Sequence, residues 1–251
     1  MNEEAPVVLV IAGVDPSGGA GIFADFRAIE QAGARALGAV TALTVQTEHS
    51  FLQYEPTPPE MLRATVRGMA GAFQIAVVKT GMLGTARTAE VVVELVDELE
   101  YEHLVVDPVI FAAVGARLVD EEAEAILREQ LVPRATLATP NMSEAAALTG
   151  IEVRDAESMA EAARALRERG TRAAVVTGGH LEGDAVDVLA TAEGVLELRS
   201  PRLPGSVHGT GCAYASAAAA ALAKGLSEVG ALSAAKAYVE SLLGQERWRS
   251  S

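Results

Sequence analysis

The sequence predicts an α/β fold whose sheet is mostly parallel and covered by helices on both faces. Short, unbroken apolar runs alternate with longer amphipathic segments through most of the chain. Such runs are typical of strands buried on both faces, and amphipathic segments of about 10 to 15 residues between them are typical of right-handed βαβ units. Glycine turns between many of the runs and the next helix favour the same class of fold.

Strand and helix pairs come first along the chain. The run "PVVLVIAG" at 6–13 predicts the first strand, and the glycine loop "VDPSGGAG" leads from it to an amphipathic helix at 22–31. The same alternation predicts further strands at 36–45, 75–81, 103–110 and 135–141, with helices at 59–73, 86–99, 120–131 and 142–149.

The last part of the chain has a different pattern. After a helix at 156–169, strand-like runs at 172–179, 184–191 and 194–201 are joined by tight turns, and we expect two of them to form an antiparallel edge. Two alanine-rich helices follow at 212–224 and 227–243. Because no repeat, low-complexity linker or composition break marks a boundary, we expect one domain over residues 1–251.

Composition excludes several classes of partner. A net charge of −14 without any basic run argues against nucleic acid and against an anionic membrane surface. No apolar run approaches the roughly 20 residues that a membrane span needs, and the first residues are acidic where a signal peptide is basic. The single cysteine cannot form an internal disulfide, which favours a reducing compartment. We therefore expect a soluble, cytoplasmic protein.

Polar and glycine residues follow the predicted strands, where ligands bind in open α/β sheets. Any one of them alone is more often a turn or a cap than part of a site. Together they form a candidate site at the carboxyl edge of the sheet: Gln46, Met82, Asp107, Asn141, Glu144 and the segment "TGGH" that begins at Thr177.

The segment "GTGC" is the most specific of these signals. It places Gly209, Thr210, Gly211 and Cys212 at the amino end of a long helix, where free backbone N–H groups and the helix dipole form an anion site. The same field would lower the pKa of the thiol, so that Cys212 could accept a proton from an attacking hydroxyl. The alternative is that Cys212 is a small buried apolar side chain.

Other common nucleotide and metal motifs are absent from the sequence. It contains no P-loop, and no dinucleotide-binding glycine fingerprint follows a strand. Its histidines are His49, His103, His180 and His208, and they lack the spacing of metal ligands. A metal site made of side chains alone is not expected, but Asp107, Asn141 and Glu144 could hold Mg²⁺ through water.

Six motifs in a fixed order reveal a family resemblance: "AGVDPSGGAGIFAD", "KTGMLG", "VVDPVI", "TPNMSEAAALTG", "GGHLEG" and "HGTGC". The chain resembles the hydroxymethylpyrimidine/phosphomethylpyrimidine kinases of thiamin biosynthesis, in the ribokinase-like superfamily, over nearly its whole length. The resemblance implies a three-layer α/β/α sandwich with a mostly parallel central sheet, and a homodimer. It also implies ATP-dependent phosphorylation of 4-amino-5-hydroxymethyl-2-methylpyrimidine, and then of its monophosphate to the diphosphate.

The resemblance assigns roles to residues of this chain. Cys212 matches the catalytic cysteine of the family, and Gly209, Thr210 and Gly211 match its anion hole. The implied cofactors are ATP and Mg²⁺, with Asp107 and Glu144 on the metal side. The positions lining the pyrimidine pocket are Gly13, Asp25, Gln46, Met82 and Val109, and those on the phosphate side are Asp107, Asn141, Glu144 and Thr177.

The chain departs from the family at two lysines expected near the transferring phosphates. Ala113 stands at one of these positions and Thr177 at the other, and Arg117 is a candidate replacement for one lysine. These losses leave open whether both phosphorylation steps survive. Two alternatives are a pyridoxal or pyridoxine kinase and a degenerate homologue that binds a pyrimidine or nucleotide without catalysis.

Overall fold

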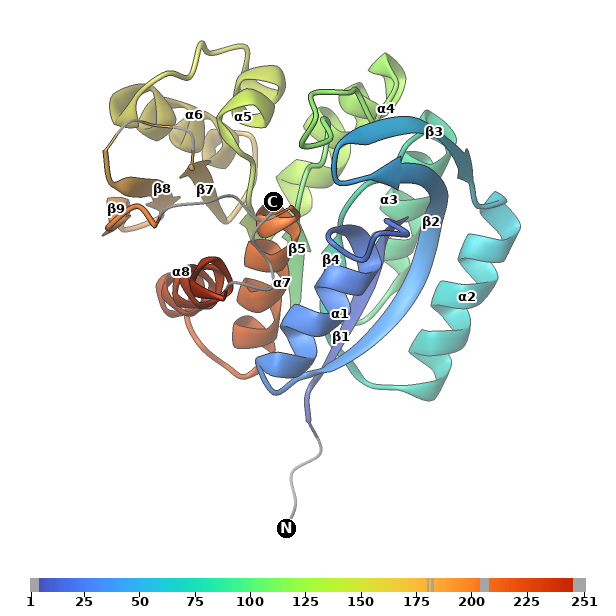
Figure 1. Cartoon of the computed structure of the whole chain (residues 1–251). Helices are drawn as coiled ribbons and strands as arrows, with labels where there is room; N and C mark the ends of the chain where they lie inside the picture. Colours follow the sequence, from blue (N-terminus) through green and yellow to red (C-terminus); the bar gives the residue numbers. More distant parts are fainter. Residues whose placement is uncertain (1–4, 180, 182, 204–207, 246–251) are drawn as a thin grey trace.

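A computed structural model describes residues 5–179, 181, 183–203 and 208–245 and contains a nine-stranded sheet (Figure 1). The strand order is β3-β2-β1-β4-β5-β6-β7-β8-β9. The strands are β1 (Val7–Val14), β2 (Arg35–Thr47), β3 (Ser50–Pro56), β4 (Ile75–Thr80), β5 (His103–Val106), β6 (Leu137–Ala138), β7 (Ala173–Gly178), β8 (Ala185–Thr191) and β9 (Gly194–Ser200).

The middle of the sheet is parallel and its two ends are antiparallel. Parallel ladders join β2 to β1 and continue through β4, β5 and β6 to β7. β3 lies antiparallel to β2 at one end, and β8 and β9 form antiparallel pairs at the other. The sequence-based prediction of a mostly parallel sheet with an antiparallel edge after β7 is therefore confirmed.

Two layers of helices cover the sheet, because its central strands are buried on both faces (Figure 1). Leu9 and Ile11 of β1 belong to the core shared with α2 to α6, whereas Val8 and Val10 belong to the core shared with α1, α7 and α8. This is the expected three-layer sandwich. The helices are α1 (Gly21–Gln31), α2 (Pro59–Ala72), α3 (Ala86–Glu98), α4 (Glu121–Ile126), α5 (Met142–Thr149), α6 (Ala156–Glu168), α7 (Thr210–Ala223) and α8 (Glu228–Gly244).

Several elements differ from the sequence-based expectation. β5 and β6 are shorter than the strands predicted at 103–110 and 135–141. β3 forms where no strand was predicted, because it is a short edge strand without the unbroken apolar run of a central strand. The helix expected at 120–131 ends as α4 at Ile126, and a π-helical turn (Leu127–Leu131) and a 3₁₀ turn (Val132–Arg134) follow it.

In the described part of the chain, every helix is too short or too polar to cross a membrane.

Candidate active site

The candidate site lies at the carboxyl ends of β1, β4, β5 and β6, where α1 and α7 also begin (Figure 1). Two glycines make this arrangement possible. Gly21 has φ +58°, and a Cβ there would lie 2.5 Å from the Gly13 carbonyl oxygen. Gly209 has φ +80°, and a Cβ there would lie 2.1 Å from the Gly19 carbonyl oxygen. Only glycine fits either position, so the start of α7 packs directly against the loop that follows β1.

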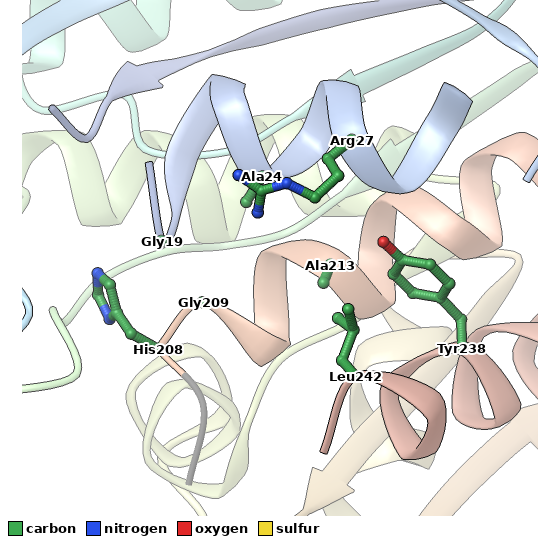
Figure 2. A pocket seen from close by; sticks show the side chains of 8 residues that line it. All are labelled: Gly19, Ala24, Arg27, His208, Gly209, Ala213, Tyr238 and Leu242. Carbon is green, nitrogen blue, oxygen red and sulfur yellow. The ribbon is translucent and has the colours of Figure 1, made fainter. Parts of the chain in front are cut away.

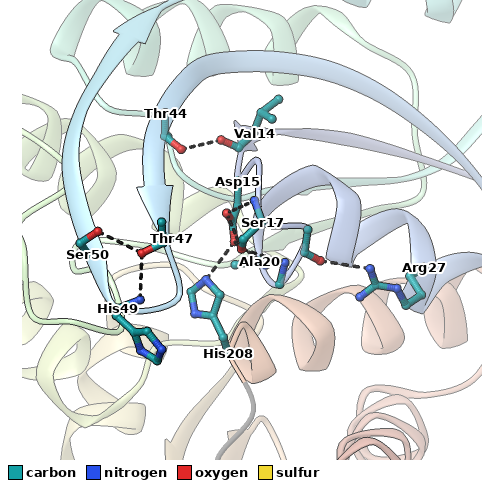
Figure 3. A network of polar contacts seen from close by, with 12 residues as sticks. Val14, Asp15, Ser17, Ala20, Arg27, Thr44, Thr47, His49, Ser50 and His208 are labelled. Atoms are coloured by element: carbon teal, nitrogen blue, oxygen red, sulfur yellow. Dashed lines mark hydrogen bonds and ion pairs between the residues drawn. The ribbon is translucent and has the colours of Figure 1, made fainter. Parts of the chain in front are cut away.

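Asp15 organises that loop (Figure 3). Its carboxylate accepts hydrogen bonds from the backbone N–H groups of Ser17 at 2.9 Å and Ala20 at 2.8 Å. Nε2 of His208, the residue before Gly209, lies 2.9 Å from Asp15 Oδ2. Burial alone would raise the pKa of Asp15, but the hydrogen bonds from His208, Ser17 and Ala20 outweigh it and lower the pKa to about 2. The ionised Asp15 thus connects the loop after β1 to the start of α7.

A buried ionic cluster lies beneath these loops. Lys79 on β4 is fully buried, and its Nζ donates a 2.8 Å hydrogen bond to Asp25 Oδ1 and lies 3.5 Å from Asp107 Oδ2. Ser216 Oγ on α7 donates to the same Asp25 oxygen at 2.7 Å. Burial by itself would lower the pKa of Lys79, but the carboxylates of Asp25 and Asp107 outweigh it and raise the pKa. Lys79 is therefore a fixed cation between the two carboxylates.

Several buried polar atoms at this edge of the sheet lack a hydrogen-bond partner among the described residues. They are Asp25 Oδ2, Thr80 Oγ1, Asp107 Oδ2 and Thr139 Oγ1. Buried polar groups are nearly always hydrogen-bonded in folded proteins. Unpartnered groups gathered at the carboxyl ends of β4, β5 and β6 therefore indicate a site that binds a polar ligand.

Cys212 lies in the first turn of α7, and its ionisation differs from the sequence-based expectation. Burial raises the pKa of the thiol, the charge of Asp107 raises it further, and Lys79 offsets only part of the rise. The expectation that the helix dipole lowers this pKa was therefore wrong. Cys212 is a neutral thiol here, and burial also raises the pKa of the nearby Asp107 carboxyl, although the charge of Lys79 offsets part of that rise.

The start of α7 is suited to an anion. Gly209 is the N-cap of α7, and no side chain of the described residues caps this helix end. The first N–H groups, from Thr210 to Cys212, are therefore left for a ligand. Cys212 and Ser216 are four residues apart and share one face of α7, which is the face that meets Asp25.

The residues predicted for the phosphate side also lie together. Asn141 and Thr177 form a parallel β-bridge at the ends of β6 and β7. Glu144 and Asn141 form a capping box at the start of α5: Asn141 N–H donates to Glu144 at 3.0 Å, and Glu144 N–H donates to Asn141 Oδ1 at 3.0 Å. Burial and the charge of Asp107 raise the pKa of Glu144 to about 8. Two acidic groups thus lie close enough to interact.

The donor set fits Mg²⁺ only through water. No three His, Cys, Asp or Glu side chains in the described part of the chain cluster as ligands for one ion. Both Glu144 carboxylate oxygens accept backbone hydrogen bonds, from Asn141 and Ile110. Asp107 Oδ2, in contrast, has no hydrogen-bond partner among the described residues. An ion that keeps most of its water is compatible with this arrangement.

The residues predicted for the pyrimidine pocket lie in two groups. Gly13, Met82 and Val109 surround an apolar region: the Met82 sulfur is 3.2 Å from a Cβ built on Gly13, and Val109 packs in the same small apolar cluster as Met82. Asp25 is fully buried beneath this region, with Oδ2 unpartnered among the described residues. Gln46 lies near the end of β2 and is partly exposed.

The suggested replacement for a family lysine has other partners. Arg117 donates to the Val119 carbonyl at 2.9 Å and forms an ion pair with Glu124 on α4. Its charge is therefore already paired at the edge of the site. Ala113 lies in the turn between Phe111 and Arg117, which form a β-bridge. His180, the last residue of "TGGH", lies outside the described residues.

The residues that hold the site together were not predicted from the sequence. They are Lys79, Ser216, Asp15 and, through its pairing with Asp15, His208. Lys79 offered one signal, because it is the only charged residue of a mostly apolar, buried strand. A lone charge in a buried strand needs a partner, and that partner had to come from another element.

A separate small pocket lies on the other side of Gly209 (Figure 2). Arg27 of α1 and Tyr238 of α8 line it, with Gly19, Ala24, His208, Gly209, Ala213 and Leu242. Gly209 is the only residue of the predicted site among them.

Comparison with known proteins decides the family. The family described as phosphomethylpyrimidine kinase matches residues 15–249. The chain belongs to this family. It is 42% identical to the hydroxymethylpyrimidine/phosphomethylpyrimidine kinase of Streptomyces coelicolor, over 93% of this chain and 87% of that protein. The predicted family resemblance is confirmed, and membership makes the protein a phosphotransferase.

Solved structures support the same fold. The ADP complex of Bacillus subtilis pyridoxal kinase superposes with a TM-score of 0.88 at 34% identity, covering 95% of this chain and 92% of that chain. Phosphomethylpyrimidine kinase from Clostridium difficile gives a TM-score of 0.84 at 29% identity, covering 94% of this chain and 98% of that chain. The sequence left open a pyrimidine kinase and a pyridoxal kinase, and both kinds of enzyme therefore occur among similar proteins.

Proposed function

We propose that this protein transfers the γ-phosphoryl group of ATP to the hydroxymethyl group of 4-amino-5-hydroxymethyl-2-methylpyrimidine, and a second one to the resulting monophosphate. The observation that carries the proposal is the position of Cys212. It lies at an uncapped helix start, close enough to the buried Asp107, Lys79 and Asp25 for their charges to shift the pKa of its thiol. An anion site, a proton-transfer group and a fixed cation therefore meet at one edge of the sheet.

The substrate side would recognise an aminopyrimidine. Its ring nitrogens accept hydrogen bonds and its amino group donates them, so an amide and a carboxylate are complementary partners. Gln46 supplies the amide, and Asp25 Oδ2 supplies a buried acceptor with no partner among the described residues. Gly13, Met82 and Val109 would pack against the flat ring.

The reaction needs a proton acceptor as well as an anion site. The substrate hydroxyl oxygen attacks the γ-phosphorus, the bond to the ADP oxygen breaks, and the hydroxyl proton must leave. Cys212 is a neutral thiol, so it can take this proton only if its own proton moves on. Asp107, the carboxylate whose charge raises the pKa of this thiol, is the proposed acceptor of that proton.

We propose that the phosphates are held by the first N–H groups of α7 and by the region around Asn141 and Thr177. Asp107 and Glu144 would hold Mg²⁺ through its water ligands, and the ion would neutralise phosphate charge. Lys79 is the one lysine buried beside the candidate site. A fixed cation there supports transfer to a substrate that becomes more negative after the first step.

Turnover of three substrates tests the proposal. ADP release would be measured with Mg·ATP and hydroxymethylpyrimidine, its monophosphate or pyridoxal, at low and high KCl. We expect turnover of the first two. Turnover of the first alone would connect Ala113 and Thr177 with loss of the second step. Pyridoxal turnover alone would favour the second candidate function, which the similarity to Bacillus subtilis pyridoxal kinase supports. Ligand binding without any turnover would identify a degenerate homologue.

We also propose a homodimer formed through the hairpin of β2 and β3. Leu43, Val45 and Leu52 are large apolar side chains of this hairpin, and they are 60%, 47% and 73% exposed. Association would remove this apolar surface from water. Light scattering after gel filtration tests it: the wild type should have twice the chain mass and Val45→Glu the mass of one chain.

A cytoplasmic location fits the use of ATP and the single cysteine.

A further inference from the structure

We propose that Phe51, on the edge strand β3, forms a wall of the substrate pocket and contributes to the choice between heteroaromatic rings. This inference rests on the proposed function and deepens it. It concerns a residue that the sequence analysis left outside the site, because β3 was not predicted.

The register of the hairpin places Phe51 beside Gln46. The two residues are direct cross-strand partners in the antiparallel ladder between β2 and β3. Direct partners project on the same face of a sheet, with Cβ atoms about 4.5 to 5.5 Å apart. Whatever Gln46 contacts is therefore within reach of the Phe51 ring.

A β-bulge turns two aromatic side chains to that face. Val45 pairs with Gln53 and Gln46 pairs with Phe51, so Leu52 is the extra residue of β3. In a regular strand Phe51 and Tyr54, three residues apart, would point to opposite faces. The bulge brings both rings to the same side, with their centroids 6.3 Å apart and their planes tilted by 41°. Leu52 is 73% exposed as a result.

The aromatic pair packs on the residues proposed to hold the ring. Phe51 and Tyr54 contact an apolar cluster built around Met82, with Ala42, Leu118, Val109 and Ala112. Tyr54 is fixed against the loop after β4, because its ring lies 2.9 Å from a Cβ built on Gly84. Phe51 is partly exposed and lies next to the polar group Gln46.

This position suits a flat heteroaromatic ring that carries a hydroxymethyl group. An aromatic side chain gains from an edge or face contact with another ring in addition to the apolar area that it covers. Ring substituents change the fit, so Phe51 would discriminate a pyrimidine from a more heavily substituted pyridine such as pyridoxal. In this proposal Phe51 contacts the substrate ring and has no role in holding the phosphates.

Kinetics of Phe51→Leu, with Gln53→Ala as the matched control, test the inference. Gln53 is an exposed polar residue of the same strand. We expect Phe51→Leu to raise the KM for hydroxymethylpyrimidine about three- to tenfold, which corresponds to the usual strength of an aromatic pair. The kcat and the KM for ATP should stay within twofold of the wild type, and the ratio of kcat/KM for pyrimidine over pyridoxal should fall. Phe51→Tyr should keep the wild-type KM, and Gln53→Ala should change none of these values.

Two results would overturn the inference. One is a Phe51→Leu enzyme with an unchanged KM for the pyrimidine. The other is an equal rise of the KM for ATP together with a lower melting temperature, which would mean that Phe51 only packs the hairpin. Calorimetric binding of hydroxymethylpyrimidine gives a readout without turnover. A wild type that neither binds nor phosphorylates the pyrimidine refutes the proposed function itself, and this inference with it.

Discussion

Lys79 and Asp25 form a fully buried ion pair: Nζ of Lys79 on β4 lies 2.8 Å from Oδ1 of Asp25 on α1, and both side chains are completely shielded from water. Asp107 adds a second carboxylate 3.5 Å from the same Nζ. Removing one member of a buried ionic group leaves an uncompensated charge, which costs far more than the intact pair contributes. This relationship ties the stability of the sheet to the candidate active site.

We therefore expect Lys79→Met to lower the free energy of unfolding by about 3 to 5 kcal/mol, because Asp25 and Asp107 would be buried without a cation. Urea denaturation followed by circular dichroism measures the change. Adding Asp25→Asn to this variant should restore part of the stability, since one carboxylate charge is then removed. An exposed ion pair contributes no more than about 1 kcal/mol. If the free energy of unfolding of Lys79→Met lay within that range of the wild type, the role given to Lys79 would be contradicted.

Alkylation of Cys212 tests the direction of its pKa shift. Only the thiolate reacts, and this is the only cysteine in the chain. Because burial and Asp107 raise the pKa of the thiol, we expect slow reaction with iodoacetamide at pH 7 and a rate that still rises at pH 10. The urea-unfolded protein is the control, and its rate should level off above about pH 8.5. A plateau below pH 7 in the folded protein would restore the original expectation of a lowered pKa.

Turnover of Cys212→Ala tests its chemical role separately. Loss of a proton-transfer group costs about a hundred- to ten-thousandfold in rate. We expect a fall of this size in kcat for hydroxymethylpyrimidine, while calorimetry shows that the pyrimidine still binds. A variant with wild-type kcat would show that Cys212 is a packing residue at the start of α7.

The pair of Asp15 and His208 predicts a pH-dependent part of the stability. The pKa of Asp15 is lowered from 3.8 to about 2, so its ionised form is favoured in the folded state. The resulting stability is complete above the unfolded pKa near 4 and is lost as the pH falls through 2. Solvent screening reduces this contribution. We therefore expect Asp15→Asn to lower the free energy of unfolding by about 1 to 2 kcal/mol at pH 6 and by almost nothing at pH 2.

Thermal unfolding from pH 2 to pH 7 measures this difference between Asp15→Asn and the wild type. Asp184→Asn is the control, because Asp184 is an exposed acidic residue. If the gap between wild type and Asp15→Asn were as large at pH 2 as at pH 6, the carboxylate charge would not be its cause.

The sequence predicted those parts of the fold and site that depend on local pattern. Central strands such as β1 have unbroken apolar runs, and the glycines before α7 showed where that helix begins. β3 was missed because an exposed edge strand lacks such a run. Gln46 was nevertheless assigned to the site, although the hairpin that orients it was not foreseen.

Contacts between distant segments could not be predicted from the sequence, for a different reason. Lys79 and Asp25 are 54 positions apart, and His208 and Asp15 are 193 positions apart. No periodicity records which buried charge will meet which partner, because the folded sheet decides it. The direction of the Cys212 pKa failed for the same reason: the helix dipole is a local feature, whereas burial and Asp107 come from the assembled site.

The two ends of α7 offer a matched test of the anion site. Gly209 before the helix and Gly225 after it have nearly the same positive φ, +80° and +82°. An alanine in this conformation costs about 1 to 2 kcal/mol at either position. At Gly225 no described atom lies within 4 Å of the added Cβ, whereas at Gly209 the Cβ would lie 2.1 Å from the Gly19 carbonyl oxygen. The start of α7 must therefore move in Gly209→Ala.

We expect Gly225→Ala to lose only the stability that corresponds to this backbone cost, and to keep its kcat. Gly209→Ala should lose more stability and, because the first N–H groups of α7 shift away from the phosphate, at least about tenfold in kcat. Urea denaturation and ADP release on the same two proteins measure both quantities. Equal kcat values for the two variants would mean that the contact between Gly209 and Gly19 does not position the anion site, and that the start of α7 binds no transferring phosphate.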